Sequence, residues 1–401
     1  MQPLLEGLRI VDITTIILGP LATQILGDMG AEVIKVEAPD GDVNRFNPPL
    51  GQADVGAGFA NNNRNKRSIA IDLKSEDGKA VLRRLVSSAD ALVHNMRQDA
   101  LDRLGFSWEA CRALNPKLIY CAALGYGSDG PYSGKPAYDD IIQAAGGIAA
   151  LTWQRDGKPA YHPTVTADKV AALHVVYAVL AALLHRERTN GQGQLVEMPM
   201  FEAISAFCIN ENLMHSTYEP RGALGYHRTM SPNRKPYPTS DGYIALLPYT
   251  TAQWRRVLDA LGRDDITSAD WFQSHTTRSA RSDELYQILS TSLGGRTSAE
   301  WLDLFESLDV PCGPVHSLES LLDDPHLAAV DFFEPNFSTE TPQVRSLRQP
   351  VLWRGLEQKA DIVAPHLGGD SRSVLAGLGY SEQEIQKLVE TGAVVAAGSK
   401  T

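Results

Sequence analysis

Short runs of β-branched apolar residues alternate with amphipathic stretches of helical spacing through the first 124 residues of the chain. Each run has the length of a strand and each stretch the length of a helix, which narrows the choice of folds considerably. Strands are expected over Arg9–Ile13, Ala31–Glu37, Ser68–Leu73, Ala91–His94 and Lys117–Ala123, and helices over Leu21–Met29, from the cap Ser75 to Val86, and over Ser107–Leu114. Strands joined by crossover helices predict a mostly parallel sheet covered on both faces, a doubly wound α/β fold.

The remaining sequence continues this pattern and then changes character near Thr217. The expected elements are a Gly-rich loop over Gly125–Gly134, helices over Asp139–Leu151, Thr166–Arg188, Thr251–Leu261 and Ser298–Leu308, strands over Gln194–Met198 and Tyr243–Leu247, and further helix over Ser371–Thr391. We therefore predict a large domain of residues 1–205 and 325–401, a linker of residues 206–221, and a smaller α+β domain of residues 222–324.

Charge and cysteine content exclude several classes of function. The chain has 37 basic and 48 acidic residues, a net charge of −11, so a nucleic-acid partner and an anionic membrane surface are not expected. Its four cysteines lie far apart and show no zinc-site spacing, which predicts no metal and a reducing compartment. The start of the sequence has no secretory pattern, and the apolar stretch Val170–Leu184 is shorter than the ~20 residues that span a bilayer. A cytoplasmic location is expected.

The turn after the first strand argues against a nicotinamide oxidoreductase. Residues 14–20 read TTIILGP and lack the G-x-G-x-x-G sequence that lets a pyrophosphate approach the backbone. This class therefore ranks last among the alternatives.

A basic stretch, Asn61–Arg67, precedes the third expected strand, and further cations follow at Lys74, Arg97 and Arg103. Cations at the ends of successive strands would suit a phosphorylated nucleotide at the edge of the sheet. A solvated charged loop explains the same residues equally well, and spacing alone leaves both interpretations open.

Asp168 is the acidic residue whose position is most suggestive of chemistry. It lies in the first turn of the apolar helix that opens at Thr166, where its carboxylate would adjoin buried surface. The helix N-terminus favours an anion by roughly 0.3–1 kcal/mol, which would keep Asp168 ionised and nucleophilic. From the residue alone, an acid that merely stabilises a helix N-terminus is the more probable interpretation, and the same holds for Asp139 and Asp140.

Taken together, several motifs resemble the family III coenzyme A transferases. The similarity runs from about Leu5 to the C-terminus. The segments that carry it are Gly19-Pro20, Gly30–Glu37, Asn65–Ser68, Asp72–Lys74, Leu104-Gly105, Gly125–Gly127, Gly130-Pro131, Arg188–Gln194, Tyr237–Gly242 and Val310–Pro314.

This resemblance implies a Rossmann-like large domain, an interlocked homodimer, and acyl-CoA and a carboxylic acid as substrates, with no tightly bound cofactor. It implies that Asp168 is the catalytic carboxylate and that Tyr138 and Asp139 lie at the reacting centre. The implied contacts to coenzyme A are Asp72, Leu73, Lys74, Asn95, Arg97, Arg103 and Leu104. The expected reaction moves coenzyme A from a thioester, such as succinyl-CoA, to a free acid through an aspartyl anhydride and an aspartyl-CoA thioester.

Two other functions remain as alternatives. One is isomerisation of an acyl-CoA at its α-carbon, although the racemase branch has a His-Asp pair where this chain has Tyr138-Asp139. The other is an acyl-CoA binding protein without turnover. Formate and oxalate are poor substrate candidates, because the branch that uses them has Gln where Ile17 stands.

Overall fold

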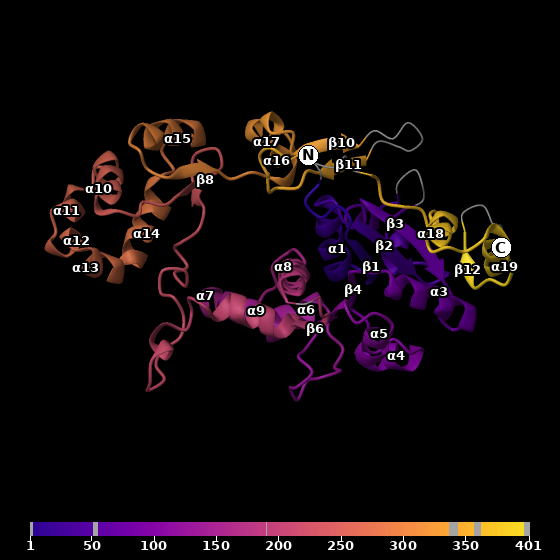
Figure 1. The fold of residues 1–401 in the computed structure, drawn as a ribbon. Helices are drawn as coiled ribbons and strands as arrows, with labels where there is room; N and C mark the ends of the chain where they lie inside the picture. The colour runs from indigo at the N-terminus through magenta and orange to yellow at the C-terminus, as the bar shows by residue number, and fades with distance from the viewer. Residues whose placement is uncertain (1–2, 51–54, 190, 337–343, 357–361, 397–401) are drawn as a thin grey trace. The chain divides into compact units, whose positions relative to one another are not determined.

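The computed structural model describes residues 3–50, 55–189, 191–336, 344–356 and 362–396 (Figure 1). Contacts group the chain into two units. Unit 1 consists of residues 1–147, 162–207 and 328–401, and unit 2 of residues 148–161 and 208–327. The grouping places residues 148–161 with the second unit. The domain limits expected from the sequence stay a prediction.

A seven-stranded sheet is the centre of unit 1. Its strands are β1 (Arg9–Ile13), β2 (Glu32–Glu37), β3 (Lys66–Ile71), β4 (Ala91–His94), β5 (Ile119–Leu124), β6 (Gln194–Pro199) and β12 (Val394–Val395). They lie in the order β12-β3-β2-β1-β4-β5-β6, with β1 to β6 parallel and β12 antiparallel to β3. The expected α/β class with a mostly parallel sheet is confirmed.

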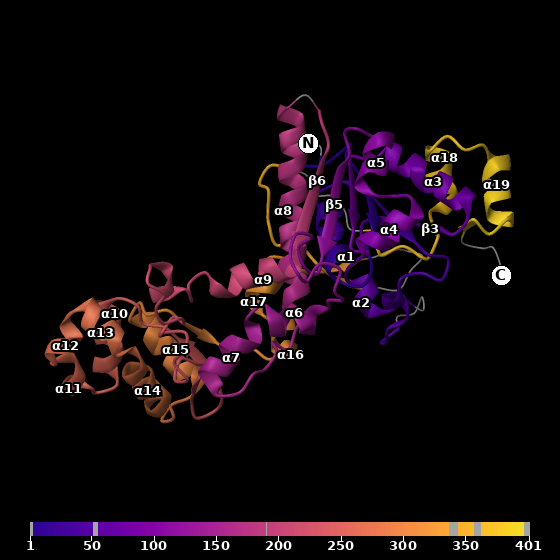
Figure 2. The same cartoon turned by 90° about the horizontal axis from the view of Figure 1, so that it is seen from below.

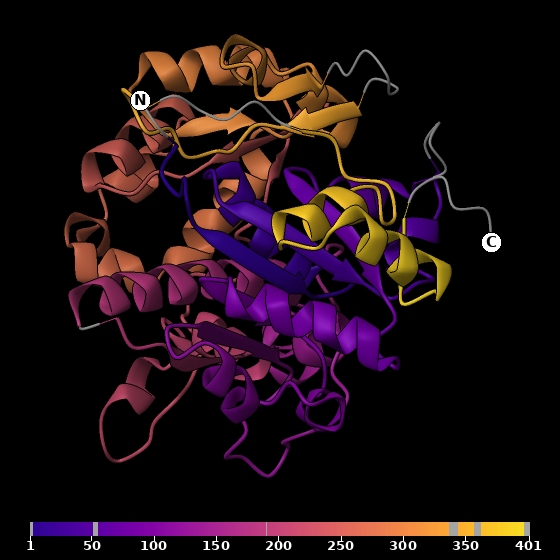
Figure 3. The same cartoon turned by 45° about the vertical axis from the view of Figure 1, so that its right-hand side comes forward.

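Helices pack on both faces of this sheet (Figure 2). On one face α1 (Leu18–Asp28) and α8 (Thr166–Arg188) pack against each other and against the strands. The cluster of apolar side chains on the other face includes residues of α3 (Glu76–Ser87), α4 (Gln98–Leu104), α5 (Trp108–Leu114), α18 (Ser371–Gly377) and α19 (Glu382–Glu390). Figure 3 shows the yellow C-terminal helices beside violet strands that are distant in sequence.

The remaining elements of unit 1 are small. They are η1 (Val43–Phe46), α2 (Ala57–Ala60), α6 (Asp139–Ala145), and the hairpin of β10 (Phe333–Asn336) and β11 (Val344–Leu347). Two helices cross the boundary between the units, α9 (Met200–Ile209) and α17 (Pro325–Ala329).

Unit 2 contains a three-stranded antiparallel sheet, β7-β8-β9, with a core that includes Trp254, Tyr286 and Phe305. Its strands are β7 (Tyr237–Pro238), β8 (Tyr243–Leu246) and β9 (Cys312–Pro314). Its helices are α7 (Ile148–Asp156), η2 (Met214–Thr217), α10 (Thr251–Ala260), α11 (Asp264–Thr267), α12 (Asp270–Gln273), α13 (His275–Ala280), α14 (Ser282–Ser292), α15 (Ser298–Ser307) and α16 (Leu318–Leu322).

Two expected helices are interrupted. The stretch Asp139–Leu151 divides into α6 and α7 because Gly147 adopts a φ of 115°, which side chains other than glycine avoid. The tail Ser371–Thr391 divides into α18 and α19 around Gly379, whose φ is 83°. In contrast, Pro20 lies inside α1, because proline fits the first turn of a helix.

Helix α8 is 23 residues long and, by length and composition, apolar enough to cross a membrane. Within unit 1 it instead packs against α1, α6, β5 and β6, with Ala171, Val175 and Val179 fully buried. Such packing is that of a core helix, which passes the same compositional test.

Candidate active site at the carboxyl edge of the sheet

The carboxyl ends of β1 to β6 share one edge of the sheet, here called the carboxyl edge. In open parallel sheets, ligands bind at this edge where the strand order reverses, which in this chain is between β1 and β4. Helix α8 precedes the parallel strand β6 and runs back along the sheet, so its first turn lies at the carboxyl edge. This turn carries Asp168.

Asp168 is half-buried and adjoins a second carboxylate. Its backbone N–H donates to Oδ1 of Asp139, the first residue of α6, over 3.0 Å. Burial, and secondly the negative charge of Asp139, raise the pKa of Asp168 to about 7. The helix N-terminus favours the ionised form of Asp168, as expected, but burial and Asp139 outweigh its ~0.3–1 kcal/mol, so that near neutral pH the ionised form is in equilibrium with the protonated one.

Gln143 fixes the chain that leads into α8. Its Nε2 donates to Oδ2 of Asp139 over 2.6 Å and to the carbonyl of Thr164 over 3.1 Å, and its Oε1 accepts from the N–H of His162 over 2.9 Å. Sequence reasoning missed this residue. The available signal was its spacing, because Gln143 follows Asp139 by four residues on one helix face.

Tyr138 precedes α6 at the N-cap position, and its side chain is 67% exposed. Asp139 is buried. The structure therefore brings together Asp139 and Asp168, and it places the Tyr138 side chain at the surface next to them in sequence.

The seven residues implied as coenzyme A contacts follow β3 or β4 in sequence. Five of them come directly after the carboxyl end of a strand, whereas Arg103 and Leu104 lie at the end of helix α4. Asp72, Leu73 and Lys74 form the turn into α3, in which Oδ1 of Asp72 accepts from the N–H of Lys74 over 2.9 Å. Arg97 is exposed at the N-cap of α4, and Arg103 pairs with Asp99 over 2.8 Å at the surface of that helix. The others are Asn95, at the end of β4, and Leu104, which packs with Leu73 against the apolar cluster.

The basic stretch Asn61–Arg67 lies at the opposite, amino edge of the sheet, because Lys66 and Arg67 begin β3. Its cations are paired: Arg64 with Asp28 over 2.5 Å, Lys66 with Asp12 over 3.0 Å, and Arg67 with Glu32 over 2.5 Å. The interpretation of this stretch as a phosphate site beside the other strand-end cations is therefore wrong. The sequence could not show to which end of the strand the cations belong.

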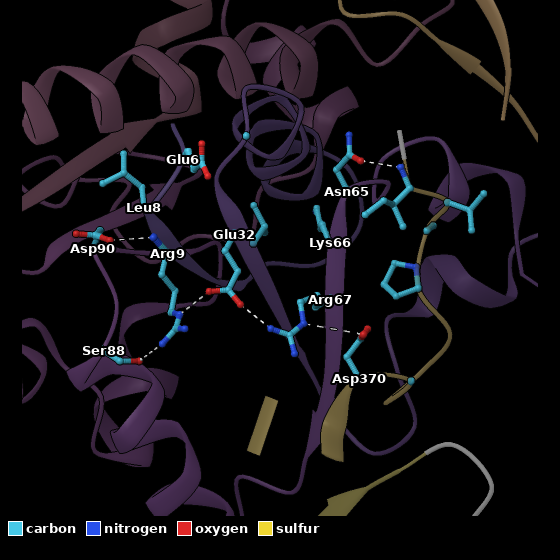
Figure 4. Close-up of a pocket in the computed structure, with 18 of the residues that line it drawn as sticks. Glu6, Leu8, Arg9, Glu32, Asn65, Lys66, Arg67, Ser88, Asp90 and Asp370 are labelled. Atoms are coloured by element: carbon cyan, nitrogen blue, oxygen red, sulfur yellow. Dashed lines mark hydrogen bonds and ion pairs between the residues drawn. The ribbon is translucent and has the colours of Figure 1, made fainter. Parts of the chain in front are cut away.

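A cavity of about 940 Å³ opens at this amino edge. Figure 4 shows Arg9 and Arg67 reaching Glu32 from opposite sides, over 2.8 and 2.5 Å, with Asp370 beyond Arg67. The charges that line the cavity thus largely satisfy one another, and Asp168 is not among its lining residues.

Cys111 and Cys121 are buried in unit 1. Burial raises the pKa of Cys111 and of Cys121 to about 12, which leaves these thiols protonated and unreactive. Within the described ranges, no group of three His, Cys, Asp or Glu side chains is placed to hold a metal ion.

Comparison with known proteins assigns the class. Residues 5–371 match the model of CoA-transferase family III. A succinate–glutarate CoA-transferase of Agrobacterium fabrum is 35% identical over 94% of this chain and 96% of its own length. A succinyl-CoA:glutarate CoA-transferase of Mus musculus is 30% identical over 98% of this chain and 91% of its own. A CaiB/BaiF family protein from Brucella suis has a similar structure, with a TM-score of 0.80 and 31% identity over 94% of this chain and 100% of the other.

An α/β protein with paired carboxylates at the carboxyl edge is thus matched, over nearly its whole length, by enzymes that transfer coenzyme A. The chain belongs to CoA-transferase family III and is an enzyme of that class.

Proposed function

We propose that this enzyme moves coenzyme A from succinyl-CoA or a related thioester to a free carboxylic acid, with Asp168 as the nucleophile. The observation that carries the proposal is the half-buried carboxyl of Asp168, whose pKa burial and Asp139 raise to about 7. The names of the relatives, which act on succinate and glutarate, favour dicarboxylic substrates.

The chemistry balances without water, metal or redox change. A carboxylate oxygen of Asp168 attacks the thioester carbonyl, the carbon–sulfur bond breaks, and coenzyme A leaves as the thiolate from a mixed anhydride. The thiolate then attacks the aspartyl carbonyl, which releases the donor acid and leaves an aspartyl-CoA thioester. The acceptor carboxylate attacks that thioester, and the thiolate, released again, attacks the acceptor's acyl carbon and frees Asp168.

The surroundings of Asp168 suit these steps. A carboxylate of raised pKa is a stronger nucleophile than an ordinary one, and half-burial limits access of the water that would hydrolyse either intermediate. Asp139 holds the first turn of α8 through the N–H of Asp168, so the attacking oxygen starts from a fixed backbone. The exposed Tyr138 is proposed to cover the substrate at this centre.

Coenzyme A is proposed to bind across the ends of β3 and β4. Lys74, Arg97 and Arg103 are exposed cations able to meet the phosphates, and Leu73 and Leu104 offer partly buried apolar surface to the base. Asp72 shapes the turn from β3 into α3, which carries Leu73 and Lys74. Asn95, which directly follows β4, is proposed as a further contact to coenzyme A.

An interlocked homodimer is part of the proposal. The support is apolar surface on unit 1: Leu173 and Tyr177 on α8 are each 58% exposed, and Leu195 on the edge strand β6 is 41% exposed. Light scattering is expected to give twice the chain mass of 43.6 kDa. A mass of one chain at micromolar concentration would contradict the dimer.

The decisive experiment is an acceptor screen with succinyl-CoA as the fixed donor. We expect new acyl-CoA in the presence of glutarate or a similar acid, and trapping of an aspartyl thioester by hydroxylamine at Asp168. Incorporation of solvent deuterium at the α-carbon without an acceptor would instead select isomerisation. Tight binding of the thioester without exchange would select a binding protein.

A further inference from the structure

Two arginines of unit 2, Arg228 and Arg278, lie near each other without an acidic partner. Arg228 precedes β7 in the sequence, and Arg278 belongs to α13. Burial, and secondly the positive charge of Arg228, lower the pKa of Arg278. Among the described residues, no Asp or Glu side chain forms an ion pair or a hydrogen bond with either guanidinium. Other arginines of unit 2, such as Arg263 and Arg281, do pair with acids.

Neutral groups hold both guanidiniums in place. Nε of Arg228 donates to the hydroxyl of Tyr286 over 3.1 Å. Nη1 of Arg278 donates to the hydroxyl of Thr251 over 2.8 Å and to the carbonyl of Phe272 over 3.1 Å. Arg228 is half-buried, whereas Arg278 is only 3% exposed. These contacts fix the two side chains, but they neutralise neither charge.

The start of α10 adds to the positive potential beside the two arginines. Thr251, which binds Arg278, is the first residue of this helix. Tyr249, two residues earlier, has its ring centre 5.1 Å from the guanidinium carbon of Arg228. The N–H groups of Thr251 and Ala252 have no acceptor in the part of the chain that the structure describes. A helix N-terminus favours a negative charge, so the helix and the two arginines attract the same kind of ligand.

This arrangement is incomplete without an anion. Two like charges that are partly removed from water destabilise the fold until an opposite charge joins them. Nε and Nη2 of the buried Arg278 have no acceptor within the described ranges, so donors remain for a ligand. The chain has 48 acidic residues against 37 basic ones, and the absence of an acid here is therefore not a matter of composition.

The chemistry of the donors favours a carboxylate as this anion. A guanidinium is planar and offers parallel N–H donors, which match the two oxygens of a carboxylate. The aromatic ring of Tyr249, which is 58% exposed, lies beside Arg228 and would shield one side of the ion pair from water. A phosphate has the same charge preference, so the test below separates these two groups.

We propose that Arg228 and Arg278 form a carboxylate-binding site in unit 2, and that its ligand is the non-reacting carboxylate of a dicarboxylic acid substrate. The inference rests on the proposed transferase function. One carboxylate of such an acid loses its charge when it becomes the thioester, but the other keeps its charge throughout and needs a cationic partner when it leaves water. Arg228, the more exposed of the pair, would contact this carboxylate directly, and the buried Arg278 would supply the second charge.

The test compares two acids of equal length, glutarate with two carboxylates and pentanoate with one. In Arg228→Gln we expect the KM of glutarate to rise at least about tenfold, because a charged hydrogen bond is lost, while the KM of pentanoate changes less than about twofold. Arg228→Lys, which keeps the charge, should recover part of the loss for glutarate. An equal rise for both acids, or no rise for glutarate, would overturn the proposal.

Arg281→Gln is the matched control. The guanidinium carbon of Arg281 also lies near an aromatic ring, 4.2 Å from the centre of Trp271, but Arg281 pairs with Glu284 over 2.9 Å. Its loss should therefore leave the KM of both acids unchanged. The Kd of free coenzyme A, measured by calorimetry, is expected to change less than about twofold in Arg228→Gln. A tenfold weaker Kd would assign the two arginines to a phosphate of coenzyme A instead and would overturn the proposal.

Binding without turnover separates this site from the transferase function. The unaltered protein should bind glutarate at least about tenfold more tightly than pentanoate in calorimetry, and Arg228→Gln should lose that preference. Equal binding of the two acids by the unaltered protein would overturn the carboxylate site. Failure of the transferase function has a different signature, because the unaltered enzyme would then exchange coenzyme A with no acid while its preference for glutarate remained.

Discussion

Asp168→Asn is expected to lower the rate of coenzyme A exchange by about 10³-fold or more, because an amide cannot form the aspartyl anhydride. The measurement is exchange between succinyl-CoA and the best acid of the acceptor screen. Asp140→Asn is the matched control, since Asp140 is an exposed acid in the first turn of α6, next to the buried Asp139, and its loss should leave the rate unchanged.

The variant should lose activity without losing its fold. The pKa of Asp168 is about 7 in the folded protein against an ordinary 3.8, so the folded state holds the proton more tightly. The unaltered protein therefore loses stability as pH rises from about 4 through 7, and the Asp168→Asn variant, whose amide does not titrate, avoids that loss. At pH 8 we expect the melting temperature of Asp168→Asn to equal or exceed that of the unaltered enzyme. Full activity of the variant would remove Asp168 as the nucleophile.

The second large effect is on the pH dependence of catalysis. Because the carboxylate form attacks and the pKa of Asp168 is about 7, kcat/KM should fall by roughly 50-fold between pH 7 and pH 5, and the slope should approach tenfold per pH unit well below the pKa. Asp139→Asn removes the nearby negative charge, lowers the pKa of Asp168, and should move this acidic limb to lower pH. The pKa of Asp168 should nevertheless stay above its ordinary value in Asp139→Asn, because burial is the larger cause of the rise.

A histidine in the site would produce the same fall of kcat/KM at acid pH, since histidines commonly titrate in this range. His162 is the relevant control, because its backbone binds Gln143 and its ring lies 3.3 Å from the hydroxyl of Thr166, near the start of α8. The limb should be unchanged in His162→Gln. A limb that moves with His162→Gln and not with Asp139→Asn would show that another group controls the rate.

Local sequence patterns were sufficient to predict the parallel sheet and to place Asp168 in the first turn of a helix. The strands are short β-branched runs, and the start of α8 is marked by polar residues before a long apolar stretch, so neighbouring residues carry both signals. The two-residue strand β12 was missed because it is too short to show a period.

Contacts between charged residues that are far apart in sequence cannot be predicted from such local patterns. Asp12 stands in an apolar strand, where burial raises its pKa. Lys66, which is 54 residues away and adjoins Asp12, more than offsets this together with Lys35 and the hydroxyls of Thr14 and Thr23, so the pKa of Asp12 lies below its usual value. Similarly, the pKa of Asp168 is raised by burial and, secondly, by the charge of Asp139 from another helix. The sequence names these residues, but only the folded chain brings their charges together.

The pairing of β12 with β3 has a consequence for biosynthesis. Because Val394 and Val395 pair with Ile71 and Ala70, a chain still being translated keeps this part of the outer edge of β3 unpaired until the two valines have been made, long after β3 itself. Nascent chains, or chains truncated before Val394, would thus expose the end of β3 to pairing with another chain, and we expect them to aggregate more readily than the full chain.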